Sequence, residues 1–324
     1  MATPTLTRLL DDNLRRSPEY GAGLSNHLPM ALHALHMLGA SDSDLDGFAT
    51  DYVRRKQLAT APADDGARSR SPRLGDFASF PAWQANFSER IAADGPRRTL
   101  VEALPELWPG VAAAAFHGPI RLAHAWEMGH PGELAAALAY WAARWQRVDV
   151  APEGGPTMDI DDWLAAAEAA ARSFRGDGRL ISQRMDEAAR MPAFRAFAGR
   201  LRPSPDVLAT VARQAAGLYA DTANFTVLHV VTGSRALLRL SAVSAPPPGA
   251  CQALAAAIVA SGIGERRRID TRHCTWDEVV TAARSSADDH VVKLVHACHE
   301  LSARVGQDDF LAAACRAVAQ RGEL

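Results

Sequence analysis

Histidine is the residue type in this 324-residue chain with the clearest chemical potential, because most of its eleven copies lie in otherwise apolar stretches. A neutral imidazole is a common metal ligand, whereas a lone histidine in such a stretch is more often a core or surface residue with a satisfied hydrogen bond. Their recurrence in several segments predicts a metal site. The histidines concerned are His27, His33, His36, His117, His124, His130, His229, His290, His296 and His299.

One stretch carries two of these histidines seven residues apart, at His117 and His124. In a helix this spacing puts both rings on one face, roughly 10 Å apart along the axis. A metal between them is within reach of both rings, but two separate histidines that line a helix groove fit the spacing equally well. Arg121 shares this face, and we expect it either to bind an anionic substrate oxygen or to form an ordinary salt bridge.

Lysine is the second signal, because only two of the 35 basic residues are lysine, Lys56 and Lys293, which leaves 35 − 2 = 33 arginines. Lys293 falls in an apolar helical segment, one turn from His290, where a bare ammonium group would be costly to desolvate. A buried amine can act as a nucleophile or add CO2 to form a carbamate, a metal ligand, and arginine can do neither. The alternative is a Lys293 side chain that reaches a carboxylate at the helix surface.

Other pairings give weaker signals. Two i, i+3 histidine pairs fit the polar edge of an amphipathic helix as well as they fit a metal, so they are left outside the predicted site. These pairs are His33/His36 and His296/His299. Glu127 and His130 match the Glu-x-x-His element of carboxylate-bridged di-iron bundles, but those sites need a second copy, which the sequence lacks.

Several enzyme classes are poor candidates because their motifs are missing from the sequence. There is no P-loop, no dinucleotide glycine fingerprint, no G-x-S-x-G turn and no H-E-x-x-H. These absences argue against a P-loop NTPase, a Rossmann oxidoreductase, an α/β-hydrolase and a zincin.

The elements that must position the histidines are helices, since apolar residues recur at helical spacing nearly everywhere. With 48% hydrophobic residues, we expect residues 1–324 to form an all-α fold, a single large multi-helix bundle. A polar segment over residues 59–76 is a candidate mobile loop, with a lid as one option. The predicted helices span residues 29–39, 42–52, 81–93, 98–107, 110–128, 131–148, 159–174, 180–190, 205–221, 224–242, 249–261, 276–286, 288–304 and 308–321.

Charge and cysteine usage bear on partners and location. The net charge of −2 gives no reason to expect nucleic acid or an anionic membrane as a partner. No segment has the apolar length of a membrane span or of a leader peptide, so we expect a cytoplasmic protein. The sequence leaves the oligomeric state open. The four cysteines are expected to be reduced thiols. They are Cys251, Cys274, Cys298 and Cys315.

Four segments together resemble the signature blocks of the questin oxidase-like proteins. They read YGAGLSNHLPMAL at residues 20–32, FHGPIRLAHA at 116–125, FTVLHVVTG at 225–233 and DHVVK at 289–293. The resemblance therefore extends over nearly the whole chain. It implies an oxidoreductase that oxidises aromatic polyketides, such as anthraquinones, with opening of a ring.

Members of that family have been described in two ways, and the resemblance leaves both open. One is a Baeyer-Villiger-type oxidase that uses NADPH, and the other is a non-haem iron dioxygenase whose iron is held by four histidines and a carboxylated lysine. The second fits this sequence better, so we expect Fe(II) as cofactor, and O2 and a small aromatic molecule as substrates. A member that binds a metal or an aromatic ligand without catalysis is a further alternative.

Carried onto this sequence, the resemblance implies Lys293 as the carbamate donor and one histidine more than the four required. His27 or His117 is the first to leave out, because His27 lies at a helix start and His117 beside a break. The implied histidine ligands are His27, His117, His124, His229 and His290. Three side chains beside the motifs are expected either to line a flat apolar pocket or to pack in the core: Met30, Trp126 and Phe225.

Overall fold

The computed structural model describes residues 2–61, 71–148, 150, 154–263, 274–306 and 308–320. In these ranges the chain is all-α, as predicted, and the only sheet is a two-stranded antiparallel one, β1 (Glu19–Tyr20) with β2 (Leu24–Ser25). Half of the candidate mobile loop at 59–76, residues 62–70, lies outside the described residues. No described helix is both long and apolar enough to cross a membrane.

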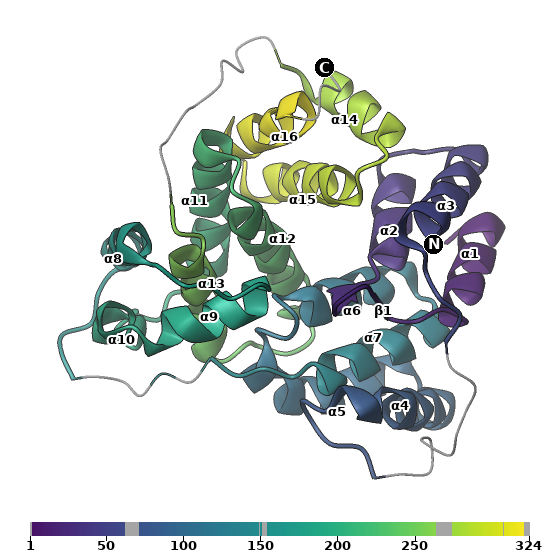
Figure 1. Cartoon of the computed structure of the whole chain (residues 1–324), viewed down its shortest axis with the longest axis horizontal. Helices are drawn as coiled ribbons and strands as arrows, with labels where there is room; N and C mark the ends of the chain where they lie inside the picture. The colour runs from purple at the N-terminus through teal and green to yellow at the C-terminus, as the bar shows by residue number, and fades with distance from the viewer. Residues whose placement is uncertain are drawn as a thin grey trace.

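Many helices follow one another after a short turn, whereas longer segments separate α3 from α4, α7 from α8 and α13 from α14. Figure 1 shows α6 and α12 near the middle of this arrangement. Two helices, α1 and α10, have no counterpart among the predicted ranges. The helices are α1 (Pro4–Leu14), α2 (Leu28–Met37), α3 (Asp42–Lys56), α4 (Phe80–Asp94), α5 (Pro96–Leu107), α6 (His117–Met128), α7 (Pro131–Ala143), α8 (Ile160–Ser173), α9 (Ile181–Arg190), α10 (Pro192–Ala198), α11 (Val207–Thr222), α12 (Phe225–Leu240), α13 (Gly249–Ala260), α14 (Trp276–Ser285), α15 (Asp289–Val305) and α16 (Asp308–Gln320), with 3-10 turns η2 (Phe77–Ser79) and η3 (Trp108–Gly110).

Four of these helices, α2, α6, α12 and α15, pack against one another in a closed ring: α2 contacts α6 and α15, and α12 contacts the same two. Their starts are well defined. The Asn224 side chain accepts from backbone N–H groups at the start of α12, and Asp288 caps α15 in the same way. The chain enters α6 through left-handed backbone at Ala114, Ala115 and Phe116, so this helix starts at His117 and not at the predicted residue 110.

A close approach fixes α6 against its neighbour α7. A methyl group on Gly118 would lie only 2.9 Å from Cγ of Trp141, so the glycine is needed for these two helices to pack at this distance. The Trp141 side chain is itself buried, and its indole N–H donates to the carbonyl oxygen of Gly110. The position of His117 at the start of α6 therefore depends on this contact.

The cysteines differ from the prediction. Cys274, just before α14, and Cys315, on α16, form a disulfide with their Cα atoms 6.4 Å apart, while Cys251 and Cys298 are free and buried. The expectation of four reduced thiols is therefore wrong for one pair. The two cysteines are 41 residues apart in sequence, and no motif links them. They meet only because α14 packs on α16.

Candidate metal centre

Four histidine side chains meet at one end of the central ring of helices. His27 immediately precedes α2, His117 is the first residue of α6, and His290 is the second residue of α15. His229 lies one turn into α12. The N-termini of four helices therefore converge on this cluster, which gives it a positive potential from the exposed ends of the helix dipoles.

The spacing of these rings matches ligands of a single ion. Following the cluster around, the ring centroids are 4.5 Å apart for His27 and His117, 5.0 Å for His117 and His229, 5.8 Å for His229 and His290, and 4.8 Å for His290 and His27. Imidazoles that bind a metal at about 2.1 Å have centroids roughly 4.5 to 5.2 Å apart when they occupy neighbouring positions. The four distances fit this range or lie just above it.

Hydrogen bonds set the tautomer of each ring. The Nδ1 atoms of His117 and His229 donate to the carbonyl oxygens of Ala114 and Phe225. His27 Nδ1 lies 2.6 Å from the carboxylate of Asp289, and His290 Nδ1 lies 3.3 Å from the same oxygen. Since these oxygens only accept, the proton belongs on Nδ1 and the lone pair on Nε2, as in metal-binding histidines. His117 Nε2 is buried with no hydrogen-bond partner among the described residues.

Burial keeps three of these imidazoles, those of His27, His117 and His229, neutral. It is the main cause that lowers the pKa of His27 to about 3, and the charge of Lys293 adds to it. Burial likewise holds the pKa of His117 and His229 well below the ordinary value of a histidine. Neutral rings offer their lone pairs to a metal at physiological pH without first losing a proton.

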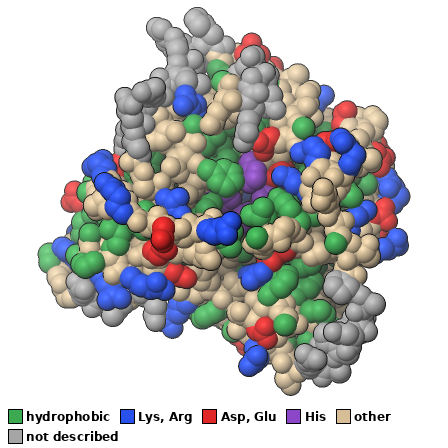
Figure 2. Space-filling model, in the orientation of Figure 1, with side chains coloured by type: hydrophobic (Ala, Val, Ile, Leu, Met, Phe, Trp, Pro, Cys, Tyr) green, Lys and Arg blue, Asp and Glu red, His purple; other side chains and the backbone are tan. Residues whose placement is uncertain are grey.

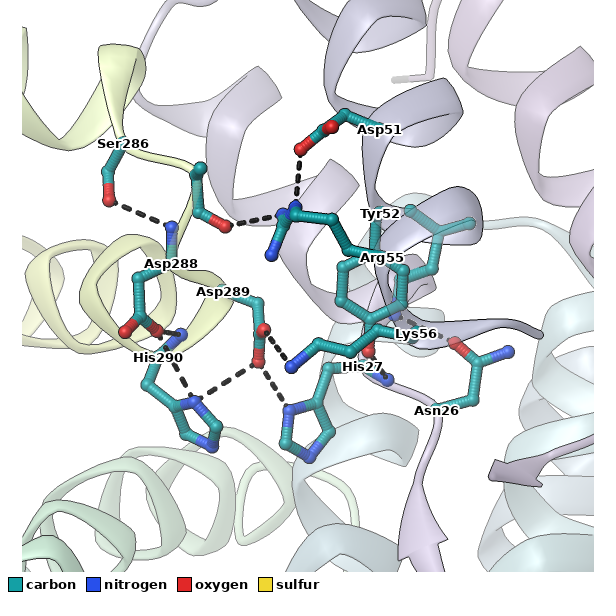
Figure 3. Close-up of polar contacts among 12 residues, drawn as sticks. Asn26, His27, Asp51, Tyr52, Arg55, Lys56, Ser286, Asp288, Asp289 and His290 are labelled. Atoms are coloured by element: carbon teal, nitrogen blue, oxygen red, sulfur yellow. Dashed lines mark hydrogen bonds and ion pairs between the residues drawn. The ribbon is translucent and has the colours of Figure 1, made fainter. Parts of the chain in front are cut away.

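Asp289 is the anionic residue of the cluster, and Figure 3 shows its carboxylate between His27, His290 and Lys56. It is 1% exposed, and Lys56 Nζ lies 3.6 Å from its second oxygen. Burial opposes its ionisation, but the interactions with His27, His290 and Lys293 outweigh this and hold its pKa well below the ordinary value. Asp289 therefore stays charged and orients two of the rings.

Lys293 lies one turn beyond His290 on α15 and is only 3% exposed. Its side chain does not reach the helix surface, so the alternative of a surface ion pair does not hold. Burial lowers the pKa of its amine to about 8, against the pull of Asp289 and Asp288 in the other direction. A substantial fraction of this amine is therefore neutral near physiological pH, which is the form that reacts with CO2.

A cavity of about 830 Å³ opens onto the cluster, and all four histidines line it. Figure 2 shows histidine side chains at the floor of a hollow, with hydrophobic and cationic side chains around them. Phe225 lines the cavity, is 49% exposed, and stands edge-on to His229 and His290. Lys56, from α3, and Arg179 and Ile181, at the start of α9, form other parts of the wall.

His124 is not part of this cluster. Its Nδ1 lies 2.7 Å from Nδ1 of His33, and its ring also contacts His296. A single metal between His117 and His124 is therefore not what the structure supports: two helical turns separate the rings, and each turns toward different partners. Of the five histidines in the predicted ligand set, the structure brings His27, His117, His229 and His290 together and leaves His124 outside this cluster.

Three other predicted site residues lie away from the cavity. Both oxygens of the buried Glu133 accept from Arg121, at 2.6 and 2.9 Å, so Arg121 forms the salt bridge that was its alternative role. Met30 is fully buried in the core. Trp126 borders a separate cavity beside Ile91 and not the one over the histidines.

Two residues of the cluster were not predicted, Asp289 and Lys56. Lys56 is the other lysine of this arginine-rich chain, so the rarity of lysine singled it out too, but it lies in a charged segment and not in an apolar one. Asp289 directly precedes His290 in sequence. Its role depends on His27, which is 262 residues away along the chain, and no local pattern could show this.

Comparison with known proteins places the chain in a family. No curated protein matches it. The model of the questin oxidase-like family matches residues 24–298, a span that includes the four histidines, Asp289 and Lys293. This match covers most of the chain, and the chain therefore belongs to the questin oxidase-like family.

Proposed function

We propose that this chain is a mononuclear non-haem iron oxygenase that uses O2 to open a ring of an aromatic polyketide, with an anthraquinone-like compound as substrate. The family points to an oxidase of aromatic polyketides. The observation that carries the iron assignment is the set of four imidazoles, each with Nδ1 next to an oxygen acceptor, at the floor of one cavity.

His27, His117, His229 and His290 would hold the Fe(II), and Lys293 would supply a fifth ligand as a carbamate. The neutral amine of Lys293 forms a bond to the carbon of CO2 and releases one proton, which leaves an anionic oxygen donor. Four neutral nitrogens with one anionic oxygen suit Fe(II). A bound Fe(II) would allow triplet O2 to react with a closed-shell aromatic substrate; the substrate itself would supply the electrons that reduce O2, and both oxygen atoms would enter the opened ring.

The residues around the ion bind and orient the substrate. The face and edge of Phe225 offer a surface for a flat aromatic ring directly beside His229 and His290. Lys56 Nζ, on the cavity wall, can donate a hydrogen bond to a phenolate oxygen while it stays close to Asp289. The helix N-termini around the cluster favour such an anionic substrate.

Asp289 fixes the tautomer of two histidine rings and takes no part in proton transfer. By accepting from Nδ1 of His27 and facing Nδ1 of His290, its carboxylate keeps the lone pairs of both rings on Nε2. The cavity is of the size that binds small molecules. Substrate in the cavity would exclude water from the reacting atoms.

The test is iron content and oxygen uptake. Wild type, His229→Ala and Lys293→Ala are reconstituted anaerobically with Fe(II), desalted and analysed by ICP mass spectrometry. His299→Ala is the matched control, because His299 is an exposed histidine on α15 that contacts Trp276. We expect His229→Ala and Lys293→Ala to hold about one iron per chain less than wild type and the control.

Oxygen uptake with an anthraquinone-like substrate should depend on that iron and need no reduced nicotinamide. Wild type that retains no iron after reconstitution would overturn the proposal. Turnover by metal-free protein with NADPH would replace it with the Baeyer-Villiger-type alternative.

A further inference from the structure

A second group of histidines lies deeper between the same helices. His33 follows His27 by six residues on α2, His124 follows His117 by seven on α6, and His296 follows His290 by six on α15. Six or seven residues of helix correspond to roughly 10 Å. All three side chains are buried, and none lines the substrate cavity.

The geometry of this second group is that of a ligand set. Its ring centroids are 5.0 Å apart for His33 and His124, 5.4 Å for His124 and His296, and 5.6 Å for His33 and His296. Tetrahedral ligation by imidazoles places the centroids about 5.2 Å apart. The three distances cluster around this value.

A carboxylate lies beside these rings, and one ring nitrogen has no hydrogen-bond partner in the described part of the chain. The carboxylate of Glu127, one turn beyond His124, has an oxygen within 4.8 Å of a ring nitrogen of both His33 and His124. His296 Nδ1 is buried and has no hydrogen-bond partner among the described residues. A buried polar atom without a partner is costly, and a bound cation would satisfy it.

The charges around the group balance before any ion binds. Arg235 and Arg239, on α12, both contact the carboxylates of Glu127 and Glu300. These two cations and two anions cancel, and a third arginine, the exposed Arg304, lies 3.9 Å from Glu300 at the edge of the group. Burial, and next to it the charge of Arg235, lowers the pKa of the three imidazoles well below the ordinary value, so each ring is neutral. In the absence of an ion, Nδ1 of His33 and Nδ1 of His124 lie 2.7 Å apart and share one proton, and a bound cation would replace this hydrogen bond.

We propose that His33, His124 and His296, together with Glu127, bind a second divalent cation of the zinc class, separate from the proposed iron centre. Three imidazoles and one carboxylate in a closed, buried position are a donor set for tetrahedral Zn²⁺. Such an ion would join α2, α6 and α15 at a level two turns below His27, His117 and His290. It would fix the distance between the helices that carry the iron ligands.

The test uses Co²⁺ as a probe in His229→Ala protein, in which the first cluster has lost a ligand. Tetrahedral Co²⁺ has strong visible absorption, whereas five- and six-coordinate Co²⁺ absorbs weakly. We expect metal-free His229→Ala protein to bind one Co²⁺ with the strong bands, and zinc to displace it. Adding His296→Ala should abolish the bands, and adding His299→Ala should leave them unchanged.

Thermal unfolding measurements show whether each variant is folded. We expect zinc to raise the Tm of His229→Ala protein, and a chelator to reverse the increase. Folded His229→Ala protein with no strong bands and no zinc-dependent Tm would overturn the second site and leave a hydrogen-bonded histidine network. The iron measurements on wild type are separate, so the iron proposal and the second site fail independently.

Discussion

Asp289→Asn isolates the contribution of one carboxylate to the histidine cluster. The substitution keeps the size of the side chain but removes its charge and introduces an NH2 donor beside His27 Nδ1, 2.6 Å away in the native protein. An amide that donates to Nδ1 moves the ring proton of His27 to Nε2 and blocks its lone pair. Loss of such an orienting carboxylate costs roughly 10- to 100-fold in metal affinity, about 1.4 to 2.8 kcal/mol.

Chelator competition measures the affinity for Fe(II) or Zn²⁺ and therefore gives this loss of affinity directly. Asp159→Asn is the matched control: the exposed Asp159 caps α8, away from the cluster, by accepting from the backbone N–H of Asp162, and asparagine caps a helix equally well. We expect the control to retain affinity within about threefold and Asp289→Asn to lose at least tenfold. Wild-type affinity in Asp289→Asn, or equal losses in both variants, would refute the role given to Asp289.

Three further predictions concern stability. Because burial lowers the pKa of Lys293 to about 8 from 10.5, its ammonium destabilises metal-free protein below pH 8, and stability recovers as the pH rises toward 10.5. Lys293→Met should therefore be more stable than wild type by about 3 kcal/mol at pH 7 and only about 1 at pH 10 in urea titrations; a gap constant with pH would contradict this. Gly118→Ala, which places a methyl 2.9 Å from Trp141, should lose about 1–3 kcal/mol in the same assay, whereas unchanged stability would mean that α6 can shift. Reducing the Cys274–Cys315 disulfide should lower stability by roughly 4 kcal/mol for its 41-residue separation, and a Tm insensitive to reductant would show that this crosslink contributes nothing.

Most helices could be predicted from the sequence, because apolar periodicity and capping residues are local signals. The start of α6 could not be predicted, because residues Ala114–Phe116 adopt left-handed backbone and the sequence has no glycine there to indicate it. The helix α1 was missed because its apolar residues Leu6, Leu9 and Leu10 lie in a charged segment. The disulfide was missed because its geometry is set by the packing of distant helices.

The candidate site was predicted only in part, because it too combines local signals with contacts between distant segments. Residue type and apolar context singled out the histidines and Lys293, but spacing along one helix does not reveal which rings share a centre. His117 and His124 are on one helix and belong to different groups, whereas His27 and His290, far apart in sequence, contact each other. Asp289 has a function only through that long-range contact.

The shared direction of α2, α6, α12 and α15 has a topological consequence. Each of these four helices begins at the first histidine cluster and runs toward the second group. The chain must therefore return along the bundle before the next of the four helices can begin. The intervening segments, α3–α5, α7–α11 and α13–α14, supply these return paths (Figure 1). The centre thus joins residues up to 262 positions apart, which makes it a late product of folding. A fragment that ends before α15 would lack His290, Asp289 and Lys293 together and would have no centre to complete.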